Sequence, residues 1–236
     1  MRPEELSAPV VVDKVLAIAK YFRNFQKVKR WAKEEGILKA PLPGETRWNS
    51  QCDMLEWYIL NWGKINQLLQ YRKGQVDVTI TKSCENMLLK RDVQHLYDVS
   101  KTIAVFLDRM QRDSCNIAQG CDLWLELLDS PYIKVNAKAL QSVKDRSQVV
   151  LESGSFFAAN LLDPRYRGQR LSPSQRKKGV DFLTEVLKSE HESAAADKGC
   201  ADVLRFVAAE ELPMALPQCF FFRVVAHAGP DRAVRL

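Results

Sequence analysis

The sequence feature that most constrains the fold is a stripe of apolar side chains that follows Ser50. Its members recur every three or four positions over four turns: Leu55, Tyr58, Trp62, Ile65 and Leu69. Ser50 and Asp53 resemble a capping box, because the Ser50 hydroxyl can accept from the Asp53 amide while the Asp53 carboxylate reaches back. We therefore expect one long helix that begins at about Ser50 and buries one face.

The segment from about Pro9 to Lys33 has the pattern of a helix with two different faces. One face is apolar, and its members are Val11, Val15, Ile18, Phe22 and Phe25. The opposite face carries cations at the same spacing: Lys20, Arg23, Lys27 and Arg30. The sequence has no acidic residue between Lys14 and Lys33. Two interpretations stay open, a solvated face or a surface that contacts the phosphates of a nucleic acid.

The later segments predict a mainly α fold with few strands. Gly36 and the run 41–44 should break the chain, and the β-branched stretch Val76–Ile80 favours a connection or a short strand. Apolar residues at helical spacing predict helices over 91–111, 116–128 and 133–151. We expect a further strand near Ser155–Leu162.

A cluster of basic residues follows that apolar run. The run ends at Asp163, because Pro164 forces its predecessor out of the helical region. The cluster comprises Arg165, Arg167, Arg170, Arg176, Lys177 and Lys178, with no acid inside it. Ser172 and Gln175 then predict a capping box that opens another helix. Cations near a helix N-terminus oppose its dipole, and either a bound anion or solvent can offset that cost.

Composition narrows the classes of function. With 46% hydrophobic and 27% charged residues the chain can bury a substantial core, and a net charge of +6 permits a polyanionic partner without requiring one. The N-terminus lacks the plan of a signal peptide, and no run of 18 apolar residues occurs, so we expect no membrane partner. The six cysteines and three histidines show no metal-ligand spacing, so we expect neither a metal nor another cofactor. The sequence indicates no small-molecule substrate.

Two separated motifs resemble one family. The first is Thr46-Arg47-Trp48-Asn49-Ser50 with Asp53-Met54-Leu55, and the second is Ala158-Ala159-x-Leu161-Leu162-Asp163-Pro164-Arg165-Tyr166 with Arg167-Gly168 after it. In this order and spacing they resemble the hAT superfamily of cut-and-paste DNA transposases and the host proteins derived from them. The resemblance covers roughly residues 10 to 190. It implies the helical insertion and a flanking part of an interrupted ribonuclease H-like domain.

The resemblance also implies a site and a partner. In such enzymes the tryptophan of the first motif stacks on a base flipped out of DNA, which nominates Trp48 for stacking and Arg47 for the neighbouring DNA. With the cations at 20, 23, 27 and 30 and with Arg165 and Arg167, these residues form the candidate DNA-binding set. The family further implies a nuclear location, Mg²⁺ in full-length members, and a homo-oligomer formed through a C-terminal region. The alternative is structural: Trp48 packs on the core and Arg47 pairs with a carboxylate.

The departures from the family concern catalysis. Metal-dependent strand cleavage needs clustered carboxylates that hold two cations, and the family places two aspartates upstream of the arginine-tryptophan motif. This chain has a single aspartate there, Asp13, within a helical pattern. We therefore expect DNA binding without catalysis, in a truncated, relic or domesticated transposase. A helical scaffold for protein partners and a part of a full-length active transposase remain alternatives.

The sequence divides into four predicted segments. Residues 1–44 form the basic amphipathic helix and a linker, and 45–152 carry the arginine-tryptophan motif and a helical region. Residues 153–211 form a return segment with the Leu-Asp-Pro-Arg motif. Residues 212–236 show no helical period and predict an irregular tail.

Overall fold

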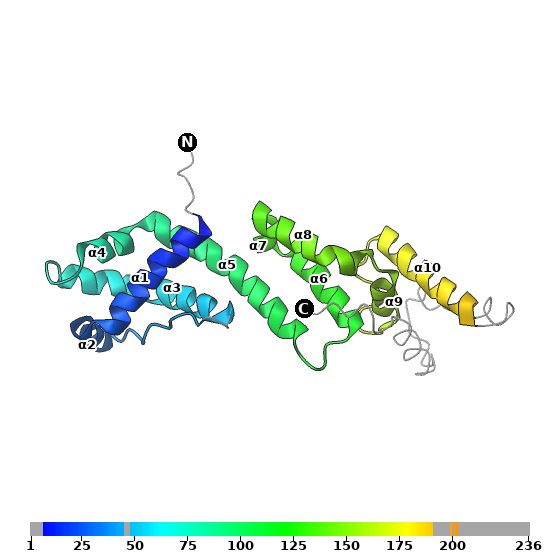
Figure 1. The fold of residues 1–236 in the computed structure, drawn as a ribbon, viewed down its shortest axis with the longest axis horizontal. Coiled ribbons are helices and arrows are strands. Elements are labelled where there is room, and N and C mark those ends of the chain that lie inside the picture. Colours follow the sequence, from blue (N-terminus) through cyan, green and yellow to red (C-terminus); the bar gives the residue numbers. More distant parts are fainter. Residues whose placement is uncertain (1–6, 45–47, 191–198, 200, 203–236) are drawn as a thin grey trace. The chain divides into compact units, whose positions relative to one another are not determined.

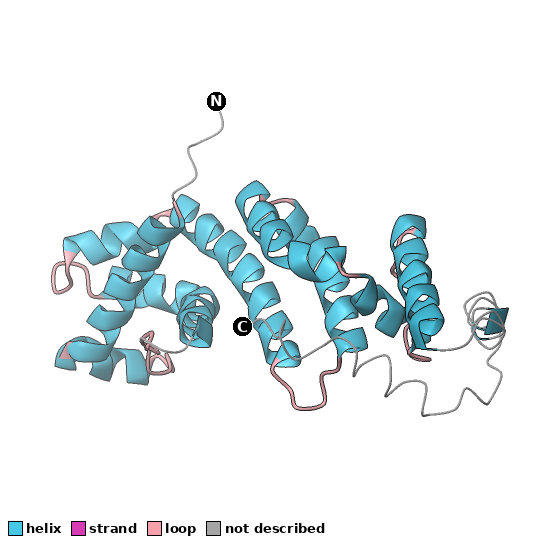
Figure 2. Cartoon of the chain, turned by 45° about the vertical axis from the view of Figure 1, so that its right-hand side comes forward, coloured by secondary structure: helices cyan, strands magenta, loops and turns pink. Residues whose placement is uncertain are grey.

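The computed structural model describes residues 7–44, 48–190, 199 and 201–202, and these fold into helices without any strand (Figures 1 and 2). The mainly α prediction is confirmed. The helices in chain order are α1 (Ala8–Asn24), α2 (Gln26–Glu34), α3 (Trp48–Tyr71), α4 (Val78–Glu85), α5 (Met87–Met110), α6 (Ile117–Asp129), α7 (Pro131–Lys134), α8 (Ala137–Glu152), α9 (Gly154–Leu162) and α10 (Pro173–Glu190).

The chain divides into two compact units, Met1–Leu107 and Asp108–Leu236, with the boundary inside α5. The predicted division into four segments remains a prediction. The predicted tail at 212–236 and Arg47 lie outside the described residues. None of the described helices has the length and apolar character needed to cross a membrane.

The first unit forms around α3. The predicted stripe on this helix is confirmed, because Leu55, Tyr58, Ile65 and Leu69 are buried and Trp62 packs against the same core. Helix α1 contributes Val15, Ile18 and Phe22 to that core and packs against α2, α3 and α4. Figure 1 shows α1 running across this group of helices.

Helix α3 begins at Trp48, earlier than the expected start at Ser50. Ser50 therefore lies inside the first turn and is not the N-cap residue. Its Oγ accepts from the backbone N–H of Gly44 at 2.9 Å, which ties the preceding linker to the helix.

The prediction of one helix from Pro9 to Lys33 is wrong. Phe25 has extended backbone angles, with φ −81° and ψ 113°, and separates α1 from α2. Because the helical period stops there, Phe25 leaves the apolar face to which the sequence pattern assigned it. Helix α2 resumes with its own buried residues, Val28, Trp31 and Ala32.

The predicted strand at Val76–Ile80 is also wrong, because this stretch enters α4. Asp77 is the N-cap residue, and its carboxylate accepts from the backbone N–H groups of Thr79 at 2.7 Å and Ile80 at 3.1 Å. The N–H of Asp77 donates to the Tyr21 hydroxyl at 3.0 Å. Capping and this tertiary contact outweigh the β propensity of the valine, threonine and isoleucine side chains.

The second unit forms around α9, and the strand predicted near Ser155–Leu162 is a helix instead. Helix α9 packs against α6, α8 and α10 and buries every residue from Phe157 to Leu162. A segment that is apolar on all sides gives no helical period, so its pattern cannot distinguish a buried strand from a buried helix.

Capping signals in this unit are observed at several helix starts. Asn116 caps α6, because its side-chain oxygen accepts from Gln119 N–H at 2.8 Å. The helix predicted over 133–151 is divided into α7 and α8, and Asn136 caps α8 by accepting from Ala139 N–H. The capping box that opens α10 is confirmed: Ser172 N–H donates to Gln175 Oε1 at 2.9 Å, and Gln175 N–H donates to Ser172 Oγ at 3.4 Å.

The close packing of α9 on α10 at Gly179 leads to a prediction about stability. A methyl group at this position would lie 2.7 Å from Leu161 Cδ1 and 3.0 Å from the backbone N of Ala158. Gly179→Ala should therefore lower the free energy of unfolding by about 1–3 kcal/mol, although alanine favours helices. Urea denaturation followed by circular dichroism measures this change.

Gly63 in α3 provides the matched control, since a methyl group there meets nothing within 4 Å. Gly63→Ala should raise the free energy of unfolding by about 0.5–1 kcal/mol. A stabilising Gly179→Ala would contradict the close packing of α9 on α10.

Candidate nucleic-acid interface

The Leu-Asp-Pro-Arg motif (residues 162–165) forms a turn at the end of α9, which is held by contacts between Asp163 and Arg165. The Asp163 carboxylate is 3% exposed, and it accepts from the Arg165 guanidinium at 2.6 Å (Nη2 to Oδ2) and 2.9 Å (Nε to Oδ1). It also accepts from the backbone N–H of Arg165 at 2.9 Å. The Arg165 side chain remains 54% exposed, so its charge is partly screened by water.

These contacts set the protonation of the pair. Burial raises the pKa of the Asp163 carboxyl, but hydrogen bonds from the Arg165 side chain, the Arg165 backbone and Asn116 outweigh burial and hold it below its usual value. The hydrogen bond to Asp163 raises the pKa of Arg165. Asp163 therefore stays ionised and compensates the charge that the sequence assigned to a DNA contact.

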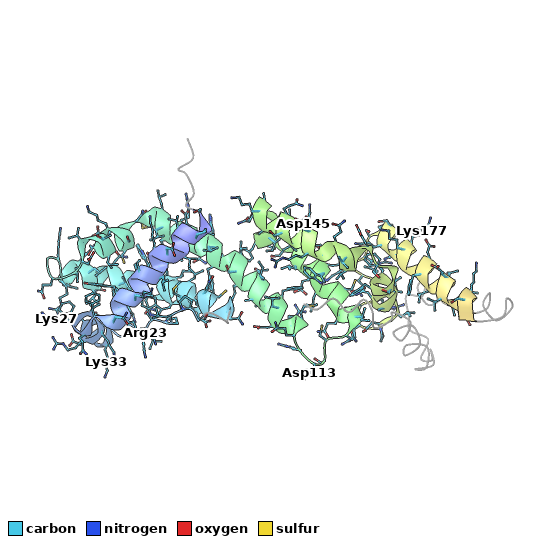
Figure 3. All side chains as sticks on the ribbon, viewed as in Figure 1. Arg23, Lys27, Lys33, Asp113, Asp145 and Lys177 are labelled. Carbon is cyan, nitrogen blue, oxygen red and sulfur yellow. The ribbon has the colours of Figure 1, made fainter. Side chains whose placement is uncertain are left out.

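The remaining basic residues of this cluster differ in their surroundings. Arg170 pairs with Asp122 of α6 at 3.3 Å, and Arg176 donates to the carbonyl of Leu171 at 3.4 Å. Arg167 adopts a positive φ of 50°, and its backbone N–H donates to Asp163 O at 2.9 Å. Lys177 and Lys178 are exposed on the first turns of α10, and Figure 3 shows Lys177 there. The carboxylates missing from the cluster are thus supplied partly by other segments of the second unit.

A second group of cations lies on α1 and α2, and we call it the basic patch. It comprises Lys20, Lys27, Lys29, Arg30 and Lys33, all of them exposed. In the part of the chain that the structure describes, none of these five side chains forms an ion pair. Arg30 and Lys33 are three residues apart, so they share the solvent face of α2 opposite Val28, whereas Lys27 lies beside the buried face, one turn before Trp31.

Arg23 belongs to the predicted ridge but behaves differently. It is half-buried, and its guanidinium donates to the backbone carbonyl of Ala40 at 3.2 Å. Figure 3 shows Arg23, Lys27 and Lys33 at the end of the first unit that α2 forms. Because α1 and α2 are separate helices, the four predicted cations do not form one continuous ridge.

Two further features of this region were not predicted from the sequence. Phe25 is 58% exposed, and Arg72 lies over the ring of Trp31 with its guanidinium carbon 4.9 Å from the centroid. Lys29 and Lys33 of the basic patch were also missed as candidates. Their signal was present in the sequence, since α2 has cations at most positions outside its buried face.

The first motif is described only in part. The backbone of Trp48 forms the start of α3, while the position of Arg47 and the surroundings of the Trp48 side chain are not described. Asp13 lies on the exposed side of α1, as its helical pattern predicts. Among the described residues, no three His, Cys, Asp or Glu side chains gather as metal ligands.

No family model, no curated protein and no solved structure matches this chain. The resemblance to hAT transposases therefore rests on the two sequence motifs.

Asp163 predicts a pH-dependent loss of stability. Asp163→Asn should lower the free energy of unfolding by about 1.5–3 kcal/mol at pH 7, because the buried carboxylate loses its charge-assisted hydrogen bonds. The folded-state pKa lies below the usual value of 3.8, so this contribution is present above about pH 4 and is lost as the pH falls through the folded pKa. Denaturant unfolding of both proteins between pH 3 and pH 7 measures the difference.

The control is Asp129→Asn, which removes an ion pair between Asp129 and Lys134 at 2.7 Å whose side chains are mostly exposed. It should change stability little at any pH in this range. A stability difference between wild type and Asp163→Asn that does not shrink toward pH 3 would count against an ionised Asp163.

Proposed function

We propose that this chain binds DNA without cleaving it, as a non-catalytic relative of the hAT transposases. The observation that carries the proposal is the basic patch on α1 and α2, whose exposed cations have no carboxylate partner among the described residues. An unpaired row of cations raises the local concentration of polyanions and is most favourably neutralised by regularly spaced phosphates.

The basic patch supports this function better than the cluster after α9. Arg165 and Arg170 already have carboxylate partners in Asp163 and Asp122, so binding a phosphate there competes with an existing ion pair. Among the described residues, no carboxylate pairs with a cation of the patch and competes in this way. We therefore assign the main phosphate contacts to Lys20, Lys27 and Arg30, and a smaller share to Arg165 and Arg167.

The sequence motifs support the finer parts of the proposal. By resemblance, the chain belongs to the helical insertion and a flank of a ribonuclease H-like domain, acts in the nucleus and forms homo-oligomers. Trp48 would stack on an unpaired base with Arg47 beside it. We expect no strand cleavage by residues 1–236 themselves, because Asp13 lies in a helix and no second aspartate within them precedes Trp48 to share a metal ion with it.

Phosphate binding by the basic patch predicts a steep salt dependence. The logarithm of the association constant for duplex DNA should fall linearly with the logarithm of salt concentration, and Lys27→Gln or Arg30→Gln should reduce the magnitude of that slope by about 0.9. Stability should change little, since glutamine keeps the helix propensity of these positions. Fluorescence anisotropy across a salt series measures both affinity and slope.

Lys138→Gln on α8 serves as the matched control, because Lys138 is exposed but lies outside the basic patch. It should leave the slope unchanged. A folded wild-type protein that binds neither duplex nor single-stranded DNA at low salt would reject DNA binding and favour a helical scaffold for protein partners.

The proposed role of Trp48 predicts a loss limited to unpaired bases. Trp48→Ala should weaken binding to a hairpin with an extruded base by about 1–3 kcal/mol and leave the salt slope unaltered, because stacking releases no counterions. The same anisotropy titrations test this, with circular dichroism as the check on folding. A variant that no longer folds would return Trp48 to a structural role.

A further inference from the structure

Phe25 is an aromatic residue that the fold leaves at the surface. It lies on the extended junction between α1 and α2, and it is 58% exposed. The apolar face of α1 continues to Phe22 and stops there. More than half of the Phe25 side chain therefore stays available for a contact outside the core.

The ring of Phe25 is held by a rigid neighbour. Its centroid lies 4.7 Å from that of Tyr21, with an angle of 42° between the ring planes. Tyr21 is itself buried, and its hydroxyl accepts from Asp77 N–H at 3.0 Å. The backbone carbonyl of Phe25 accepts from Lys29 N–H at 2.8 Å, which fixes the residue to the first turn of α2. The ring is therefore positioned by Tyr21, and the backbone of Phe25 is fixed to α2 by Lys29.

Cations that form no ion pair with any described residue follow Phe25 directly. Lys27 is two positions further along, and Arg30 and Lys33 continue the solvent face of α2. Figure 3 shows Lys27 and Lys33 on this helix, with Arg23 nearby. An exposed aromatic ring next to cations that can follow a phosphate backbone is the combination that binds single-stranded nucleic acids, because each base offers a face for stacking.

We propose that Phe25 stacks on an unpaired base, so that the basic patch binds single-stranded nucleic acid in preference to duplex. The inference rests on the proposed DNA binding by the same patch and adds the form of nucleic acid that it selects. Bases of a duplex are stacked on each other and offer no free face to a ring on the protein surface. Phe25 therefore adds affinity only where a base is free, while the cations contribute on any phosphate backbone.

Three probes of equal length and label separate these contributions: single-stranded oligothymidylate, an abasic oligomer with the same phosphates, and a duplex. Wild type should bind oligothymidylate most tightly. Phe25→Ala and Phe25→Leu should weaken binding to oligothymidylate by about 5- to 100-fold and leave the abasic oligomer and the duplex unchanged. Phe25→Trp should retain tight binding, because tryptophan restores the stacking surface that leucine lacks.

The controls separate failure of this inference from failure of the proposed function. Tyr132→Ala removes a 49% exposed aromatic residue of the second unit and should not change the affinity for any of the three probes. Lys27→Gln should weaken binding to all three probes. Equal affinity of wild type for the three probes, or equal losses on all of them in Phe25→Ala, would overturn the stacking role while leaving phosphate binding intact. A wild type that binds none of the probes would reject the proposed function itself, and circular dichroism confirms that each variant is folded.

Discussion

Burial of one face of α3 is the constraint on which the first unit depends. Its apolar stripe fixes the position of α1, and two of its tryptophans also hold the chain on either side. Trp57 Nε1 donates to the carbonyl of Leu38 at 2.9 Å, and Trp62 Nε1 donates to the carbonyl of Cys84 at 3.0 Å. The indoles thus satisfy backbone groups of the linker and of α4 while their rings add apolar area.

The elements predicted correctly from the sequence are those with a one-sided apolar stripe or a local cap. Helices α3 and α10 belong to this group, because periodicity and a capping box depend only on residues close in the chain. Helix α9 was not predictable in this way, since it is apolar all round and its helical state depends on three neighbours. The break at Phe25 was also invisible, because the apolar spacing continues through a residue whose backbone is extended.

In the candidate site, too, features set by nearby residues could be predicted from the sequence, and features set by tertiary packing could not. The exposure of Arg30 followed from its place opposite the apolar face of α2. The ion pair between Arg170 and Asp122 did not, because the two residues are brought together by the packing of α9 on α6 and are far apart in sequence. Charge counted along the chain therefore overstated the free charge after α9. It described the basic patch well, since none of the members of the patch forms an ion pair in the described part of the first unit.

The placement of α9 also has a consequence for synthesis on the ribosome. Its apolar residues are covered by α6, which precedes them in the chain, and by α10, which follows them. Gly179 of α10 lets the backbones of α9 and α10 approach closely. During vectorial synthesis α6 can pair with α8 early, whereas Phe157 and Leu161 stay without their second cover until the residues of α10 have left the exit tunnel. During this interval the apolar residues of α9 can bind chaperones or aggregate. The yield of folded protein therefore depends on how quickly α10 is synthesised.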